Sequence, residues 1–502
     1  FALAVTLPRA GNLGGGGFML VHLAHKRKTI AIDYRETAPS GATRDMFLDR
    51  SGIFMPEKSQ GSGAGVGVPG TVAGLALAHE KYGSGKFTLA DLAAPAIRLA
   101  REGIDVEPDL AFSLAEVGAR IARFPASRAI FIRPDGKPFR AGERLLQSDL
   151  AASLERIAHE GASGFYTGVT AEKIAAAVRS LGGAMTVQDL KDYRAVEREV
   201  VHGTYRGHQV VSMPPPSSGG VHIIEILNIL EGFPLAELGQ NSAATIYLMA
   251  EAMKRAYADR EIYLGDPDFV HVPVAGLTSK AYAAELRQTI SLDRATPAEE
   301  IAPGMPLPYE SDQTTHFSVV DADGNAVANT YTLNFSYGLG LVAEGTGILL
   351  NNELDDFAAT NGAPNAFGLL GGDANAPGPR KRPLSSMSPA MVFKDGELEI
   401  VTGSPGGSRI ITTVLQIILN IVDHGMNAAE ASEAVRVHHQ LHPDELRVER
   451  GLSIDTIRLL EAKGQRVRLQ RSMGSAQTIQ RLGGMLYGAA DTRQRGTAAI
   501  GY

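Results

Sequence analysis

Residues 312–321 read Asp312-Gln-Thr-Thr-His-Phe-Ser-Val-Val-Asp321, and they carry the strongest structural signal in this sequence. The preceding segment, Thr296–Tyr309, contains Pro, Gly and Glu with little periodicity, as an exposed linker or loop does. The following residues have the composition of two strands, Thr315–Asp321 and Ala326–Leu333, joined by an Asp-Gly turn. The pattern therefore predicts that a loop meets a buried β-hairpin at Thr314.

A threonine at such a junction has two interpretations. The plainer one is a β-forming residue in a strand. In the other, the chain is cut between Gln313 and Thr314, and Thr314 becomes a new N-terminus. A threonine hydroxyl stays protonated at neutral pH, whereas a free α-amine, which titrates near about 7.7–8.0, would provide a base on the same residue. Cleavage would thus create nucleophile and base together, and the residues alone leave both interpretations open.

The rest of the chain indicates strands and helices in alternating layers. The periodicity predicts strands at Phe18–His22, Thr29–Tyr34, Tyr205–Met213, Ala390–Lys394 and Leu398–Thr402. It predicts helices at Gly70–Tyr82, Leu89–Glu102, Leu150–Glu160, Ala171–Leu181, Gly220–Leu230, Ile246–Tyr263, Arg409–Val422, Ala428–Val437 and Thr456–Lys463. We expect Ile246–Tyr263 to be amphipathic.

Composition excludes several classes of function. The net charge is −7, and no basic stripe with interleaved aromatic residues is present, which argues against a nucleic-acid partner. The chain has no cysteine, so disulfides, thiolate metal sites and a cysteine nucleophile are excluded. No run approaches the roughly 20 apolar residues of a membrane span. No His or carboxylate pair has metal-ligand spacing, so we expect no metal and no cofactor.

Six motifs, taken in chain order, resemble the γ-glutamyltranspeptidase family of bacterial type. They are Gly11-Asn-Leu-Gly-Gly-Gly-Gly17, Asp33-Tyr-Arg-Glu-Thr-Ala-Pro39, Met213-Pro-Pro-Pro-Ser-Ser-Gly-Gly220, the 312–321 segment, Leu384-Ser-Ser-Met-Ser-Pro389 and Thr402-Gly-Ser-Pro-Gly-Gly-Ser-Arg409. Each is weak alone, but six in family order are specific, and the resemblance extends from about Leu3 to Tyr502. It implies an α+β fold, the four-layer αββα sandwich of the N-terminal nucleophile (Ntn) hydrolases. It also implies one intertwined unit cut into a large part, 1–313, and a small part, 314–502.

The resemblance assigns the catalytic groups. Thr314 would be the nucleophile, and Thr332, on the second hairpin strand, would hydrogen-bond to it and assist processing. The backbone amides of Gly406 and Gly407 would form the oxyanion hole. A plain strand-to-helix turn would need the same glycines, so the sequence alone does not separate the two interpretations.

The resemblance also assigns a site for the γ-glutamyl head group. Arg35, Ser385 and Ser386 would bind its α-carboxylate. Glu353 and Asp356, with Asn334 nearby, would bind its α-ammonium; some relatives carry Gln in place of Glu353. From the residues alone, plainer interpretations remain: a surface ion pair for Arg35 with a neighbouring acid, a solvated loop for the acidic run, and turn-forming serines.

Two further features bear on the site. Asn361–Pro379 resembles the lid loop of bacterial members, and Phe367 stands where close relatives carry Tyr, which removes one gating hydroxyl. His316 follows the threonine pair, but as an alternating strand residue without a partner motif we expect it to be structural. Gly11–Gly17 precedes a strand rather than following one, so we reject a dinucleotide-binding loop.

The predicted activity is γ-glutamyl transfer from glutathione or other γ-glutamyl amides to amino acids, peptides or water. Two alternatives remain: a cephalosporin or glutaryl acylase of the same superfamily, and an uncleaved protein that binds glutamate-like ligands without catalysis. By resemblance we expect a periplasmic or secreted protein. Because the chain begins at Phe1 rather than Met, we expect a leader and some mature N-terminal structure to precede it.

Overall fold

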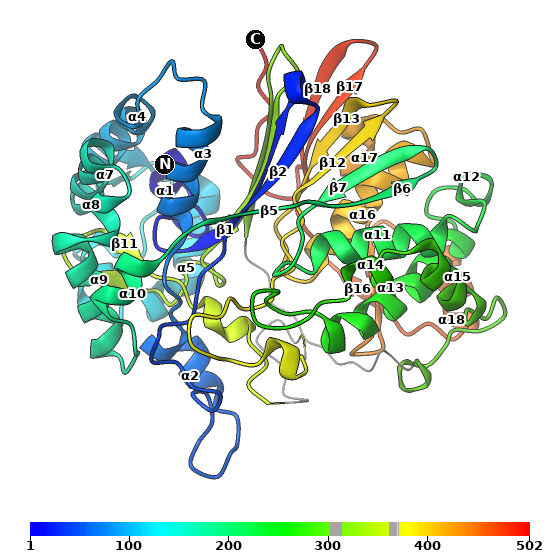
Figure 1. The fold of residues 1–502 in the computed structure, drawn as a ribbon, viewed down its shortest axis with the longest axis horizontal. Coiled ribbons are helices and arrows are strands. Elements are labelled where there is room, and N and C mark those ends of the chain that lie inside the picture. The colour runs from blue at the N-terminus through cyan, green and yellow to red at the C-terminus, as the bar shows by residue number, and fades with distance from the viewer. Residues whose placement is uncertain (302–313, 361–368, 370) are drawn as a thin grey trace.

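The computed structural model describes residues 1–301, 314–360, 369 and 371–502. Two antiparallel sheets lie side by side between two layers of helices, which is the predicted αββα order (Figure 1). The first sheet has the order β5-β2-β1-β9-β8, formed by β1 (Gly16–Leu23), β2 (Lys28–Tyr34), β5 (Val196–Arg198), β8 (Thr315–Val320) and β9 (Ala326–Thr332). The second has the order β18-β17-β13-β12-β7-β6, formed by β6 (Val201–Tyr205), β7 (His208–Ser212), β12 (Ala390–Lys394), β13 (Glu397–Thr402), β17 (Gln477–Leu482) and β18 (Met485–Ala490).

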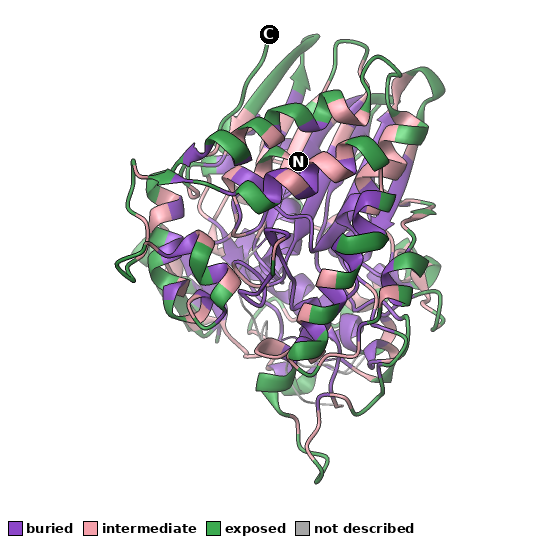
Figure 2. Cartoon of the chain, turned by 90° about the vertical axis from the view of Figure 1, so that its left-hand side faces the viewer, coloured by how far each residue is buried: buried purple, intermediate pink, exposed green. Residues whose placement is uncertain are grey.

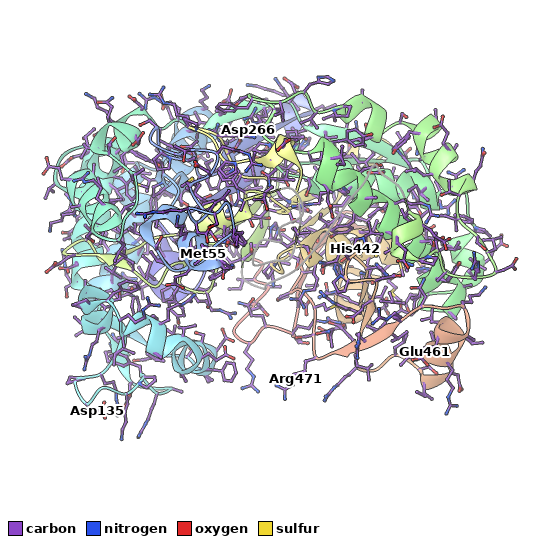
Figure 3. All side chains as sticks on the ribbon, turned by 90° about the horizontal axis from the view of Figure 1, so that it is seen from below. Met55, Asp135, Asp266, His442, Glu461 and Arg471 are labelled. Carbon is purple, nitrogen blue, oxygen red and sulfur yellow. The ribbon has the colours of Figure 1, made fainter. Side chains whose placement is uncertain are left out.

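Helices cover both outer faces. Beside the first sheet lie α1 (Ala2–Thr6), α3 (Thr71–Tyr82), α4 (Leu89–Glu102), α5 (Pro108–Ile121), α7 (Ser148–Glu160), α8 (Ser163–Tyr166), α9 (Gly168–Ser180) and α10 (Val187–Asp192). Beside the second lie α11 (Gly219–Leu230), α13 (Ala243–Tyr263), α15 (Lys280–Gln288), α16 (Arg409–Val422), α17 (Ala428–Glu433) and α18 (Ile454–Ala462). Seen from below, Asp135 and Glu461 lie at the outer edges of the two helical layers (Figure 3).

Shorter elements join these layers. They are α2 (Pro56–Gln60), α6 (Pro125–Phe131), α12 (Leu235–Leu238) and α14 (Val274–Leu277), with the paired strands β3 (Ile104–Asp105) and β4 (Arg144–Leu145), β10 (Val342–Ala343) and β11 (Ile348–Leu349), and β14 (Val437–His438), β15 (Leu446–Glu449) and β16 (Val467–Gln470).

Strand β1 explains why the centre of the molecule is apolar on both faces. Phe18 and Leu20 belong to the large core that includes the second sheet and its helices, whereas Met19 and Val21 pack in a separate cluster with residues of α3. Alternate side chains of a strand point to opposite faces, so a strand between two packed layers is apolar throughout. Seen from the side of the first helical layer, the central strands are buried and the outer faces of the helices are exposed (Figure 2).

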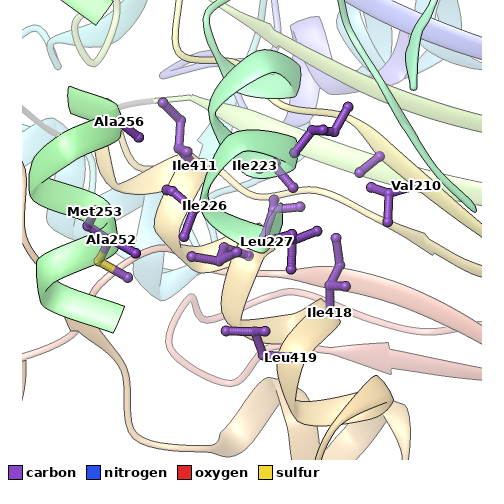
Figure 4. Packing of buried hydrophobic residues seen from close by; sticks show 14 of the residues in the cluster. Val210, Ile223, Ile226, Leu227, Ala252, Met253, Ala256, Ile411, Ile418 and Leu419 are labelled. Carbon is purple, nitrogen blue, oxygen red and sulfur yellow. The ribbon is translucent and has the colours of Figure 1, made fainter. Parts of the chain in front are cut away.

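The second helical layer packs against its sheet through aliphatic side chains. Ile226 of α11 lies on the side of α13, whereas Ile223 and Leu227 lie toward Val210 of β7 and Ile418 of α16 (Figure 4). Ile226 and Leu227 are at most 1% exposed. Full burial of such a side chain stabilises the fold by about 1.5–3 kcal/mol. This core fixes α13 and α16, whose ends reach the site described below.

The first sheet joins the part of the chain before Gln313 to the part after it. β1 pairs with β2 on one side and with β9 on the other, where Gly17 faces Tyr331. A Cβ on Gly17 would lie 2.4 Å from the Thr330 carbonyl oxygen, so the close approach of β1 and β9 requires glycine there. The run leads into β1 rather than following a strand, which agrees with the rejection of a dinucleotide-binding loop.

The predicted hairpins at 315–333 and 390–402 are confirmed, with positive φ at Gly324 and Gly396. Two predictions were wrong in detail. The single strand Tyr205–Met213 is the second half of the β6–β7 hairpin, which turns at Arg206 with φ +50°. α13 is not amphipathic, because other elements cover every side of it and all residues from Thr245 to Glu261 are buried.

No helix of the described residues is long and apolar enough to cross a membrane. Within the same residues no group of three His, Cys, Asp or Glu could hold a metal ion.

Candidate active site

The two threonines singled out by the sequence lie at one end of the β8–β9 hairpin. Thr314 directly precedes β8 and is 8% exposed. Thr315 faces Tyr331, so the antiparallel register, continued by one step, sets Thr314 opposite Thr332. The Thr332 hydroxyl oxygen accepts a hydrogen bond from the backbone N–H of Asn334 at 3.0 Å. The hairpin therefore brings both hydroxyls to the same end of the first sheet.

A single pocket collects most of the predicted site. Eight predicted residues line it: Thr314, Thr332, Asn334, Glu353, Asp356, Ser385, Ser386 and Gly407. Five further residues line it that the sequence did not single out: Arg260, Leu369, Met387, Ser408 and Ile410. Arg35 and Gly406 adjoin it, because Arg35 bonds to Glu353 and Asp356 and Gly406 precedes Gly407 in the chain.

One wall of the pocket presents hydrogen-bond acceptors without a donor. Asn334 is buried at φ +75°, and its Nδ2 donates to the Asn352 carbonyl at 3.0 Å. Its Oδ1, and Oε2 of Glu353, are buried and have no hydrogen-bond partner among the described residues. Burying an acceptor without a partner costs about 1–3 kcal/mol. This wall is therefore suited to a ligand that donates hydrogen bonds, such as an ammonium group.

The same pocket also presents two hydroxyl donors, Ser385 and Ser386. The Ser385 oxygen accepts from the Met387 backbone N–H at 3.1 Å, and the Ser386 oxygen accepts from Arg260 Nη2 at 3.3 Å. In the described part of the chain neither hydroxyl donates to a protein acceptor, so each hydrogen is available to a ligand. A carboxylate, which only accepts hydrogen bonds, suits these two serines.

Arg35 lies at the centre of a buried ion cluster. It follows β2, is completely buried, and pairs through Nη1 with Glu353 and through Nη2 with Asp356. Its Nε donates to the Pro383 carbonyl at 3.1 Å, which connects the guanidinium to the loop that carries Ser385. The plainer interpretation of Arg35 as one half of a surface ion pair is therefore wrong.

Burial raises the pKa values of the carboxylic acids in this cluster. Desolvation raises the pKa of Glu353 to about 7, opposed by the charge of Arg35. Desolvation also raises the pKa of Asp356, again opposed by Arg35, and raises that of Glu36 well above its ordinary range. Nearby carboxylates add to the shifts of Glu353 and Glu36, because several negative charges share one guanidinium. An additional cation, such as a ligand ammonium, would relieve this excess of negative charge.

The Gly406–Gly407 turn connects β13 to α16. Its φ angles are +136° at Gly406 and +56° at Gly407, conformations that favour glycine. The backbone N–H groups of Arg409 and Ile410 donate to the carbonyls of Gly406 and Gly407 and start the helix. The two glycine N–H groups themselves have no acceptor in the described part of the chain. Free backbone donors at a helix N-terminus suit a negatively charged oxygen.

The described end of the predicted lid segment, Asn361–Pro379, contacts Asp356 and the loop that carries Ser385. The Asn375 side chain donates to the Asp356 carbonyl at 2.7 Å and accepts from the Leu384 N–H at 2.9 Å. The Asn375 side chain thus links Asp356 to the loop that carries Ser385 and Ser386. Two predicted residues, Gln313 at the cleavage site and Phe367 of the lid, lie outside the described residues.

His316 has a structural environment. Its ring nitrogens bond to the hydroxyls of Thr330 and Ser318 at 2.8 and 3.0 Å. Burial lowers its pKa to about 3, so it stays neutral. It does not line the pocket, which agrees with its predicted structural role.

Comparisons with known proteins agree with this geometry. A family model described as Gamma-glutamyltranspeptidase matches residues 1–501. A glutathione hydrolase proenzyme of Escherichia coli strain K12 is 56% identical, over 100% of this chain and 86% of that protein. A crystal structure of a cephalosporin acylase from Bacillus halodurans superposes with a TM-score of 0.86 at 28% identity, over 100% of this chain and 90% of that one. Helicobacter pylori gamma-glutamyltranspeptidase gives a TM-score of 0.59 at 44% identity, over 61% of this chain and 86% of that one.

Proposed function

This chain belongs to the gamma-glutamyltranspeptidase family, and from that premise we propose that it cuts itself before Thr314 and uses the freed threonine to transfer γ-glutamyl groups. It is an enzyme of the Ntn hydrolase fold, and it passes the γ-glutamyl group to water or to an amine. The proposal goes further in assigning each step to a residue of the pocket.

One observation carries the assignment of the donor head group. Unpartnered acceptors, Asn334 Oδ1 and Glu353 Oε2, and unused donors, the hydroxyls of Ser385 and Ser386, line the same pocket as Thr314. The γ-glutamyl group carries an α-ammonium and an α-carboxylate on one carbon, which satisfies both sets at once. A glutaryl group lacks the ammonium and would leave the buried acceptors without a donor. The pocket therefore favours γ-glutamyl over glutaryl donors.

The chemistry follows from the position of Thr314. Its Oγ1 attacks the γ-carbonyl carbon while its own α-amine takes the hydroxyl proton. The N–H groups of Gly406 and Gly407 hold the oxyanion, and the Thr332 hydroxyl orients the nucleophile. The tetrahedral intermediate then releases the leaving amine, which receives the proton from the α-ammonium, and leaves a γ-glutamyl ester on Thr314. Water or an acceptor amine attacks this ester and regenerates the hydroxyl.

We propose that the cut parts, 1–313 and 314–502, remain one body. β1 and β2 of the first part share a sheet with β8 and β9 of the second, and β7 pairs with β12 in the other sheet. Separating the parts would expose both sheet interiors. Glutathione is the proposed donor, amino acids or short peptides are the proposed acceptors, and the proposed location is the periplasm or the exterior of the cell.

A donor series tests the proposal. The γ-glutamyl, glutaryl and 4-aminobutyryl p-nitroanilides share the scissile amide, but the second lacks the α-ammonium and the third lacks the α-carboxylate. We expect kcat/KM for γ-glutamyl to exceed both others by at least about 10-fold, the size of one lost charge-assisted hydrogen bond. A preference for the glutaryl compound would identify an acylase instead. An uncut chain that binds glutamate without turnover would identify a binding protein.

A further inference from the structure

Arg260 is a buried cation of the pocket that the mechanism above does not use. It lies near the C-terminal end of α13, is 3% exposed, and lines the pocket together with Asp356 and Ser386. Its Nε donates to the Ser218 hydroxyl at 3.1 Å and its Nη2 donates to the Ser386 hydroxyl at 3.3 Å. Both contacts are with neutral groups.

A buried guanidinium that forms no salt bridge lowers the stability of the fold. In the described part of the chain Arg260 forms no salt bridge, whereas Arg35 pairs with both Glu353 and Asp356. Removing one charge from water destabilises the fold unless a partner compensates. Arg35 is thus in direct contact with two carboxylates, whereas Arg260 has Asp356 and Glu261 only at a longer range, where their charges oppose the lowering of its pKa by burial. An anionic ligand group in this pocket would give Arg260 a direct salt-bridge partner.

The contact with Ser386 also sets the direction of a hydroxyl. Because Ser386 Oγ accepts from the guanidinium, its hydrogen is directed away from Arg260. The Ser218 hydroxyl, which accepts from Arg260 Nε, donates to the Ser385 carbonyl at 2.8 Å. One planar guanidinium therefore contacts the loop that carries Ser385 and Ser386 at two points. It bonds directly to the Ser386 hydroxyl, and through Ser218 it is connected to the Ser385 carbonyl.

We propose that Arg260 is a specificity-determining residue for the donor: it orients the Ser386 hydroxyl and supplies positive charge to the ligand's α-carboxylate. This inference rests on the proposed assignment of the pocket to the γ-glutamyl head group. It differs from the role of Arg35, whose charge is shared with the two acids that receive the ammonium.

Competitive inhibition by two small molecules isolates this role. L-Glutamate carries the α-carboxylate, and 4-aminobutyrate is the same molecule without it. In Arg260→Met we expect the inhibition constant of glutamate to rise about 10- to 100-fold, as for the loss of one hydrogen bond to a charged group, with that of 4-aminobutyrate within about 2-fold of wild type. Equal changes for the two compounds, or no change for glutamate, would overturn the proposal.

Arg255→Met is the matched control. Arg255 lies on the same helix and is equally buried, but it pairs with Glu251 at 3.0 Å and does not line the pocket. We expect it to lower thermal stability while both inhibition constants stay within about 2-fold of wild type, because the loss of a buried ion pair acts on folding rather than on the ligand. Loss of glutamate affinity alone in this variant would show that helix disturbance, not Arg260, sets the selectivity.

Arg260→Lys provides a second route if the methionine variant does not fold or does not cut itself. Lysine keeps the charge but cannot span both serines, so glutamate inhibition should weaken about 3- to 10-fold, less than for loss of the whole contact. This effect should shrink in a Ser386→Ala background if Arg260 acts partly through Ser386. An undiminished effect would overturn the positioning role. A wild-type enzyme that does not discriminate glutamate from 4-aminobutyrate would instead refute the head-group assignment itself.

Discussion

Asn334 and Glu353 form the wall of the pocket that presents hydrogen-bond acceptors. Replacing Glu353 with Gln changes one atom of this wall from an acceptor to a donor. Glu353 Oε1 accepts from Arg35 Nη1, so in Glu353→Gln the new amide oxygen must keep that place and the new NH₂ group must occupy the place of Oε2. A hydrogen bond to a charged group contributes about 1.5–3 kcal/mol, or about 10- to 150-fold in affinity. In the proposed complex Asn334 and Asp356 would still face the ammonium, so we expect the lower end, a rise in KM of about 10-fold near pH 8.

The pH dependence of this effect has a definite sign. Burial raises the pKa of Glu353 to about 7, so the group is neutral at lower pH and a carboxylate at higher pH. The ligand ammonium prefers the carboxylate. Donor affinity of the wild-type enzyme should therefore increase as the pH rises through about 7 and then level off. Glu353→Gln has no such group, so its KM should lack this inflection and should approach the wild-type value in acid.

The assay is KM for γ-glutamyl-p-nitroanilide between about pH 5.5 and 8.5, a range that brackets this pKa. Asp355→Asn is the control, because Asp355 belongs to the same 3₁₀ turn, Glu353–Asp356, but does not line the pocket. It should keep the inflection, moved slightly lower, since the Asp355 charge raises the pKa of Glu353. An inflection of KM near pH 7 that persists in Glu353→Gln would show that a group other than Glu353 controls donor binding.

Further predictions concern other parts of the site. Arg35→Lys should raise the donor KM about 10-fold or more, with a smaller effect on kcat. The reason is that a lysine ammonium cannot keep both ion pairs and the bond to the Pro383 carbonyl. An unchanged KM would count against a role of Arg35 in donor binding. Gly407→Ala should lower kcat about 100- to 1,000-fold, as expected for a disturbed oxyanion donor. Alanine disfavours the φ of +56° at this position, so the backbone N–H would move. A near-normal kcat would exclude Gly407 as an oxyanion donor. Dialysis against a chelator should leave the rate of γ-glutamyl transfer unchanged. A loss of activity that is restored by added metal would contradict metal-free chemistry.

Local sequence patterns predicted the hairpin at Thr314 and the turn at Gly406 and Gly407. Strand alternation and turn chemistry act over a few residues, so they are visible without tertiary contacts. The helix ends were less well predicted: the helix expected over Ala428–Val437 ends at Glu433, and Val437 belongs to β14. β14 has only two residues and pairs with the next strand, β15, and a strand this short is too brief for periodicity to show.

The burial of the polar residues was not visible in the sequence. A solvated loop was the plainer interpretation of residues 351–357, yet the Asn351 side chain bonds to the backbone of both Gly14 and Gly67 and draws the acidic turn inward. Arg260 was missed because its partners, Ser218 and Ser386, come from distant segments. The available signal was an arginine on a helix that is otherwise rich in small and apolar residues. Only packing shows that every side of that helix is covered.

The proposed chemistry requires Thr314 to become a chain terminus before it becomes a nucleophile. N-terminal sequencing of the active, purified protein tests this most directly, together with Thr314→Ala on a denaturing gel. The active protein should yield two fragments, one of them beginning Thr314-Thr315-His316, and the alanine variant should remain a single inactive chain of 53.2 kDa. Full turnover by a polypeptide that is continuous across residues 313 and 314 would show that catalysis does not need a free α-amine on Thr314.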